Sequence, residues 1–167
     1  EGHYTRSLDE VYHEAAQAIG APTKEFHIVG GLHPKLRLSY YTDMIRGLRE
    51  RFPHIHIKAL TAVEIAHLAR IEKSSVREVL VRLKEAGLTS LPGGGAEVFS
   101  TAVRATIAER KLTGDEWLAV HREAHQLGIP TNCTMLYGHV ETADDRIELV
   151  VGDVPLVCDM SSNILSR

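Results

Sequence analysis

Four short stretches of the chain place glycines or helix starts beside side chains that can bind a ligand or move a proton. In the first, Gly30 and Gly31 precede His33, which Pro34 holds in an extended conformation. Glycines leave backbone amides accessible, so the pair is suited to an anionic or amino-acid-like ligand. The alternative is a tight turn after a strand, and a lone histidine is more often structural.

The second and third stretches add two carboxylates. Thr61 is expected to cap a helix whose first turn contains Glu64, a position that the helix dipole favours for a carboxylate irrespective of function. A run of three glycines costs backbone entropy and gives nothing to a core, so it indicates a sharp turn or a close approach to a ligand. Glu97 lies just beyond the run, and a flexible loop tip is the alternative. The three glycines are Gly93, Gly94 and Gly95.

The fourth stretch contains a candidate acid–base pair, His139 and Glu141. Thr134 and Tyr137 precede the pair in the same stretch. All four residues lie in or just after the last predicted strand, where a ligand of a parallel sheet is expected to bind.

Metal-binding patterns are weak. His121 and His125 have the i, i+4 spacing of two ligands on a helix, but no glutamate makes an H-E-x-x-H sequence, so an exposed helix surface is expected. Cys133 and Cys158 are 25 positions apart, which fits neither a metal site nor a disulfide framework. We expect reduced thiols, a cytoplasmic location and no metal site built from this chain.

Hydrophobic periodicity and turn residues position these stretches. We predict short strands that alternate with helices, which is typical of right-handed β-α-β units and a parallel α/β sheet. All four stretches then follow the carboxyl ends of strands, so they are expected to converge on one ligand-binding edge. The predicted strands are residues 25–29, 54–60, 88–91 and 131–137, and the helices are residues 8–19, 40–52, 62–71, 75–86, 101–108 and 115–127. His27 and His56 lie inside strands, where packing or a satisfied hydrogen bond is expected, and Trp117 is expected in the core.

Composition indicates a soluble, globular protein. The 167 residues are 44% hydrophobic and 25% charged, and the net charge of -3 gives no basic footprint for nucleic acid. No apolar run reaches the roughly 18 residues of a membrane-spanning segment, so no membrane partner is expected.

Together the four stretches resemble the aminodeoxyfutalosine synthases, radical S-adenosylmethionine enzymes of the futalosine route to menaquinone. The resemblance covers about residues 3–148. The motifs read Phe-His-Ile-Val-Gly-Gly-Leu-His-Pro from Phe26, His-Ile-Lys-Ala-Leu-Thr-Ala-Val-Glu-Ile from His56, Leu-Pro-Gly-Gly-Gly-Ala-Glu from Leu91, and Thr-Met-Leu-Tyr-Gly-His-Val-Glu-Thr from Thr134.

The resemblance implies a partial (β/α) barrel of about four parallel strands that uses S-adenosylmethionine and a [4Fe-4S] cluster. The implied reaction adds a 5′-deoxyadenosyl radical to 3-[(1-carboxyvinyl)oxy]benzoate. Gly30 and Gly31 match the turn that meets the methionyl amino group, and Glu97 matches a position near the adenosyl ribose. The residues expected to line the radical and substrate chamber are Thr134, Tyr137, His139 and Glu141.

Two other readings stay open. Dehypoxanthine futalosine cyclase and FO synthase share the glycine loop and the Gly-His-x-Glu-Thr stretch, although the first two motifs favour the synthase. A non-catalytic chimeric or fragment scaffold is the alternative from another class. It is suggested because this sequence lacks the Cys-x-x-x-Cys-x-x-Cys motif, which in the family lies upstream of the position of Tyr4. Because those cysteines hold the cluster, we expect this chain to be catalytically incomplete.

The tail also departs from the family pattern. We divide the chain into a partial barrel at residues 1–148 and an atypical tail at residues 149–167. Residues 152–167 resemble a piece of phosphoserine aminotransferase, but the tail has no lysine for a Schiff base, so no cofactor is assigned to it. The open edges of a four-stranded sheet are expected to favour association between copies of the chain.

Overall fold

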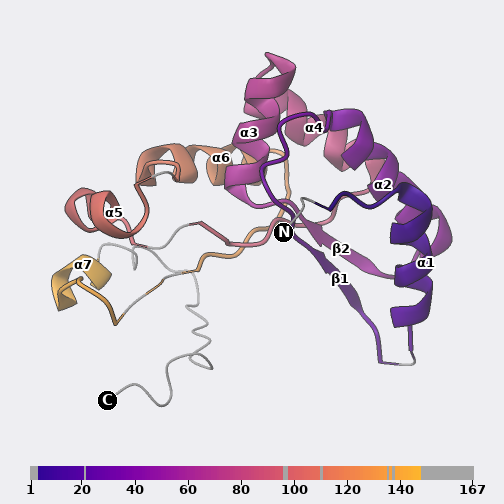
Figure 1. The fold of residues 1–167 in the computed structure, drawn as a ribbon, viewed down its shortest axis with the longest axis horizontal. Helices are drawn as coiled ribbons and strands as arrows, with labels where there is room; N and C mark the ends of the chain where they lie inside the picture. The colour runs from indigo at the N-terminus through magenta and orange to yellow at the C-terminus, as the bar shows by residue number, and fades with distance from the viewer. Residues whose placement is uncertain are drawn as a thin grey trace.

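The computed structural model describes residues 4–20, 22–95, 98–109, 111–134, 136 and 138–147, and Figure 1 shows the course of the chain. The tail at residues 149–167 therefore lies outside the described part. The two strands are β1 (Glu25–Ile28) and β2 (His56–Ala59). The helices are α1 (Leu8–Ala18), α2 (Leu38–Arg51), α3 (Ala62–Glu72), α4 (Val76–Ala86), α5 (Thr101–Ile107), α6 (Gly114–Gln126) and α7 (Ala143–Ile147). None of the helices in the described residues is long and apolar enough to cross a bilayer.

The sheet is parallel and follows the order of the chain. Strands β1 and β2 pair in parallel, with Glu25 opposite His56 and Ile28 opposite Ala59. Two further parallel bridges, Lys58 with Ser90 and Leu91 with Thr131, continue the same order. The predicted parallel α/β arrangement is confirmed.

Of the about four parallel strands predicted, the first two are regular strands in the described residues, and the third and fourth take part through these single parallel bridges. The Thr89 hydroxyl accepts from the Ile57 amide and donates to the Ile57 carbonyl, each at 2.7 Å. A side chain therefore makes hydrogen bonds to β2 that a regular strand would make with its backbone. Pro92 follows Leu91 and has no N–H to extend pairing. Backbone bonds still join the segments, including Leu91 N to Pro130 O at 3.0 Å.

Side-chain caps fix where the helices begin. Ser7, Thr61 and Thr113 each accept from the amide three residues on, and a glutamate at that position bonds back to the cap residue. Helix α4 begins after Ser75 and ends at Gly87, whose φ of 112° is left-handed, as predicted. The short α7 was not predicted, although Thr142 and Asp145 form the same reciprocal cap, at 2.7 Å between Thr142 N and Asp145 Oδ2.

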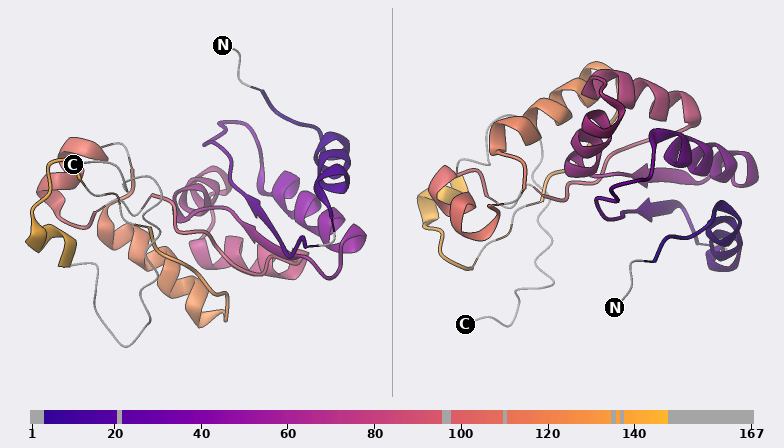
Figure 2. Two further views of the ribbon diagram at one scale, coloured as in Figure 1. Left: turned by 90° about the horizontal axis from the view of Figure 1, so that it is seen from below. Right: turned by 45° about the horizontal axis from the view of Figure 1, so that its top comes forward.

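The two faces of the sheet differ in character. Figure 2 shows α2, α3 and α4 on one side of β1 and β2. The side chains of Ile57 and Ala59 are buried among these helices, with Phe26 and Ile28 packed against them. The alternate positions of both strands carry polar residues that are half-buried or exposed. Among them, His27 is exposed, so it does not pack in the interior, which was one of the two roles expected of it.

His121 is buried, and the prediction of an exposed position on its helix is wrong. Only 5% of the residue is exposed, and its ring stacks on Trp117 with 3.6 Å between ring centroids. Within the described part of the chain, its Nε2 has no hydrogen-bond partner. Burial, with a smaller effect of His125, lowers the pKa of His121 to about 4. The buried ring is therefore neutral at pH 7.

We predict that His121→Phe makes stability less dependent on pH. The pKa of His121 falls from 6.5 to about 4 on folding. Below pH 6.5 the unfolded chain therefore takes up a proton that the folded chain does not, and wild type loses stability as the pH falls toward 4. Between pH 7 and pH 4.5, urea unfolding should show wild type losing about 2 to 3 kcal/mol more than the variant. Equal losses would show that His121 does not titrate in this way.

Candidate functional site

The Glu64 carboxylate joins the ends of both strands. It lies at the first turn of α3 and is 5% exposed. Its Oε1 accepts from the Gly30 amide at 2.9 Å, and its Oε2 accepts from the amide and the hydroxyl of Thr61, each at 2.8 Å. The turn after β1 is thereby fixed to the start of the helix that follows β2. Glu64 was predicted as a binding residue; the structure gives its carboxylate these three bonds within the protein.

The glycine run packs against neighbouring protein atoms. A Cβ atom on Gly93 would lie 2.5 Å from the carbonyl oxygen of Asn132, and one on Gly94 would lie 2.8 Å from Cγ2 of Thr61. Gly95 has a φ of 86°, and a Cβ there would lie 2.6 Å from Cγ2 of Val63. The run thus lies between the start of α3 and the segment after Pro130. Close packing is by itself a sufficient reason for glycine at these positions.

Two side chains hold the backbone of this run. The Thr134 hydroxyl donates to the Gly93 carbonyl at 2.6 Å. Trp117, confirmed in the core, donates from Nε1 to the Gly94 carbonyl at 3.2 Å. Sequence reasoning missed this role of Trp117; the available signal is that a buried indole N–H usually finds an acceptor.

The structure therefore brings together residues from all four predicted stretches. Direct contacts connect the strand ends, the start of α3 and the glycine run into one unit, which we call the glycine edge. Gly31 belongs to it by chain position, and a Cβ atom there would meet nothing within 4 Å. The members of the glycine edge are Gly30, Gly31, Thr61, Glu64, Gly93, Gly94, Gly95 and Thr134.

The other predicted residues make local contacts. The ring of His33 accepts the amides of Lys35 and Leu36 through Nδ1, at 3.1 and 3.0 Å, so it stabilises its own turn. The Glu141 carboxylate accepts the amides of Gly138 and His139, the latter at 3.0 Å. Glu97 and Tyr137 lie outside the described residues.

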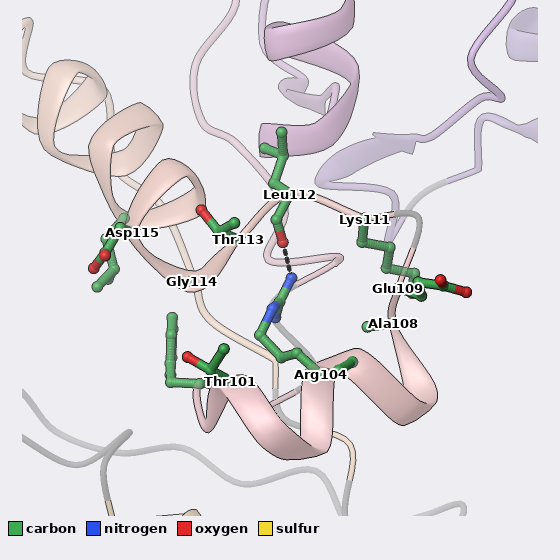
Figure 3. A pocket seen from close by; sticks show the side chains of 12 residues that line it. Thr101, Arg104, Ala108, Glu109, Lys111, Leu112, Thr113, Gly114 and Asp115 are labelled. Atoms are coloured by element: carbon green, nitrogen blue, oxygen red, sulfur yellow. Dashed lines mark hydrogen bonds between the residues drawn. The ribbon is translucent and has the colours of Figure 1, made fainter.

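A sizeable cavity in the described part of the chain is lined by residues other than those of the glycine edge. It measures about 810 Å³ and lies between α5 and the start of α6 (Figure 3). The buried Arg104 guanidinium crosses it and donates to the carbonyls of Val98 and Leu112. None of the predicted site residues lines this cavity.

The histidines, cysteines and carboxylates of the described residues form no metal-binding cluster. Across the residues that the structure describes, no group of three or more His, Cys, Asp or Glu side chains is arranged to hold a metal ion. Cys133 is a free, exposed thiol, and Cys158 lies outside the described residues.

Comparisons with known proteins match most of the chain. The family model described as "Radical SAM superfamily" matches residues 1–151. The chain is 47% identical over 148 residues to aminodeoxyfutalosine synthase of Thermus thermophilus, covering 89% of this chain and 40% of that protein. It is 41% identical over 148 residues to aminodeoxyfutalosine synthase of Streptomyces coelicolor, covering 89% and 38%.

A relative with another name is almost as similar. The 5-amino-6-(D-ribitylamino)uracil–L-tyrosine 4-hydroxyphenyl transferase of Methanopyrus kandleri is 40% identical over 145 residues, covering 87% of this chain and 39% of that protein. The chain thus spans about 40% of the length of the curated relatives it matches.

We predict that Glu64→Ala destabilises the protein much more than Glu116→Ala. Both glutamates close a reciprocal cap with a threonine, but Glu116 is exposed and Glu64 is buried and also holds the Gly30 amide. The loss at Glu64 should be about 3 kcal/mol, because partly buried donors lose their acceptor, against about 1 kcal/mol at Glu116. Urea unfolding measures both, and equal losses would contradict the bridging role of Glu64.

We also predict that Gly94→Ala is destabilising and that Thr61→Ser relieves it. The alanine methyl should cost about 1 to 3 kcal/mol, because it would contact Cγ2 of Thr61 at 2.8 Å. Serine keeps the capping hydroxyl and lacks that methyl, so the double variant should recover about 1 kcal/mol in a double-mutant cycle. Gly31→Ala, which meets open space, is the matched control and should change stability by less than about 0.5 kcal/mol. Additive effects of Gly94→Ala and Thr61→Ser would show that the two positions do not clash.

Proposed function

Because the chain belongs to the radical S-adenosylmethionine superfamily, we propose that it forms part of an aminodeoxyfutalosine synthase. The proposed reaction adds the 5′-deoxyadenosyl radical derived from S-adenosylmethionine to the enol-ether carbon of 3-[(1-carboxyvinyl)oxy]benzoate, with rearrangement and loss of the carboxyl group. The product is aminodeoxyfutalosine, on the route to menaquinone.

The observation that carries the proposal is the joined glycine edge in a chain 47% identical to one synthase and 41% identical to another. The stretches that resemble the synthase are distant in sequence, yet Glu64 and the glycine run connect them in space. Parallel α/β folds bind ligands at this edge of the sheet.

Gly30 and Gly31 are the proposed contacts for the methionyl part of S-adenosylmethionine. The bond from the Gly30 amide to Glu64 fixes the backbone of the turn, so its direction is set before a ligand arrives. The space beside Gly31 is free of protein atoms within 4 Å of a Cβ position, which permits close approach of a ligand to the backbone. The glycine run is connected to the same turn through Thr61 and Glu64.

The described residues do not fit a [4Fe-4S] cluster. Such a cluster is held by cysteine thiolates, and the one cysteine in the described part of the chain is Cys133. We therefore derive no step that passes through the cluster. The family implies a cluster for the whole protein. The matched relative is about two and a half times as long as the segment that matches it.

A second candidate function is the joining of L-tyrosine to 5-amino-6-(D-ribitylamino)uracil, as named for the relative that is 40% identical. The two candidates belong to the same superfamily match and differ in the molecules that would react. Dehypoxanthine futalosine cyclase and FO synthase activities remain the branch alternatives suggested by the shared sequence motifs.

The test uses the complete open reading frame that encodes this chain, read upstream of Glu1 and downstream of Arg167. After anaerobic iron–sulfur reconstitution, the protein is given S-adenosylmethionine with 3-[(1-carboxyvinyl)oxy]benzoate, with dehypoxanthine futalosine, or with L-tyrosine and 5-amino-6-(D-ribitylamino)uracil. We expect mass spectrometry to detect aminodeoxyfutalosine in the first reaction alone. A product in either other reaction, with none in the first, would replace the proposal with that activity.

A further inference from the structure

The face of the sheet opposite the helices carries a row of polar side chains. Residues alternate along both strands, so the positions that do not pack on the helices share one face. This polar row consists of Glu25, His27, His56, Lys58 and Ser90. The sequence signal is the polar–apolar alternation of Glu-Phe-His-Ile and His-Ile-Lys-Ala.

The polar row is internally ordered. The Lys58 ammonium lies 2.9 Å from the Glu25 carboxylate, and the His56 ring lies 3.7 Å from the same carboxylate. His56 Nε2 is 2.8 Å from the hydroxyl of the buried Ser90. Lys58 and Glu25 retain 25% and 33% side-chain exposure, so each is partly desolvated but accessible to a ligand.

Lys58 has hydrogen-bonding capacity beyond this ion pair. An ammonium group has three donors, and among the described residues the ion pair recorded for Lys58 is the one with Glu25. Partial burial raises the strength of its attraction for a further anion above that of a solvated lysine. Val29, the residue directly after β1, is 57% exposed and offers an apolar surface two residues beyond His27.

The polar row comes before the glycine edge along both strands. Lys58 precedes Thr61 by three residues and His27 precedes Gly30 by three, so at about 3.3 Å per residue the backbone of these two residues lies within roughly 10 Å of the edge. A ligand on the row would reach toward a second ligand at the glycine edge.

We propose that the polar row binds a carboxylate group of the substrate, with Lys58 as the anion-binding residue and Glu25 as the carboxylate that competes with the ligand for Lys58. The ligand class is an aromatic carboxylate, whose charged group meets Lys58 and whose ring meets Val29. This inference rests on the proposed function, because the benzoate substrate supplies that carboxylate.

The probe is 3-hydroxybenzoate, and its neutral analogue 3-hydroxybenzamide is the ligand control. Both are titrated into the ¹⁵N-labelled 167-residue chain and followed by the amide signals of β1 and β2 in NMR spectra. We expect saturable shifts with the carboxylate and a dissociation constant at least about tenfold weaker for the amide, as for loss of a charge-assisted bond. No saturable binding of 3-hydroxybenzoate, or equal binding of the amide, overturns the proposal.

Two variants with opposite expected effects separate an anion site from a purely structural ion pair. Lys58→Gln should weaken 3-hydroxybenzoate binding by about tenfold or more, and Glu25→Gln should strengthen it, because it removes a carboxylate that competes for Lys58 and repels the ligand. Lys24→Gln, at an exposed lysine just before β1, is the matched control and should leave binding unchanged. If Lys58→Gln does not give a folded spectrum, Glu25→Gln decides: unchanged or weaker binding overturns the proposal.

Failure of this site and failure of the proposed function give different results. Binding of 3-hydroxybenzoate that depends on Lys58, without aminodeoxyfutalosine formation by the complete gene product, supports the carboxylate site and rejects the synthase function. Aminodeoxyfutalosine formation combined with Lys58-independent binding keeps the function and removes Lys58 from the substrate site.

Discussion

The buried Glu64 carboxylate is the interaction on which the arrangement of the candidate site depends. A carboxylate without partners would be costly at this depth, but its oxygens accept one amide from the end of β1 and an amide and a hydroxyl from Thr61. The start of α3 adds a favourable dipole. One residue therefore sets the distance between two strand ends that are more than 30 positions apart in sequence.

The glycine run shows how packing and binding requirements coincide. Its three glycines are needed because Thr61, Val63 and Asn132 leave no room for a Cβ atom. Bonds from Trp117 and Thr134 fix its carbonyls. A loop held in this way loses little conformational entropy when a ligand binds, which favours a preformed site. Gly31 differs, since its Cβ position faces open space.

The sheet divides the molecule into a covered face and a polar face. Helices bury the apolar face, which supplies most of the hydrophobic stabilisation. The polar face carries charges paired with one another.

The sequence by itself determined the helices other than α7, the Thr61 cap, the parallel arrangement of the segments and the family, because periodicity, capping residues and motifs are local signals. It also placed Gly30, Thr61 and Gly94 at one edge. Only the tertiary structure decided that Glu64 bridges two strand ends, that Trp117 holds the glycine run and that His121 is buried while His27 is exposed. Those outcomes depend on which distant backbone atoms a side chain contacts. The third predicted strand is limited to single bridges because Thr89 and Pro92 interrupt its backbone pairing. Local patterns contain no information on such contacts.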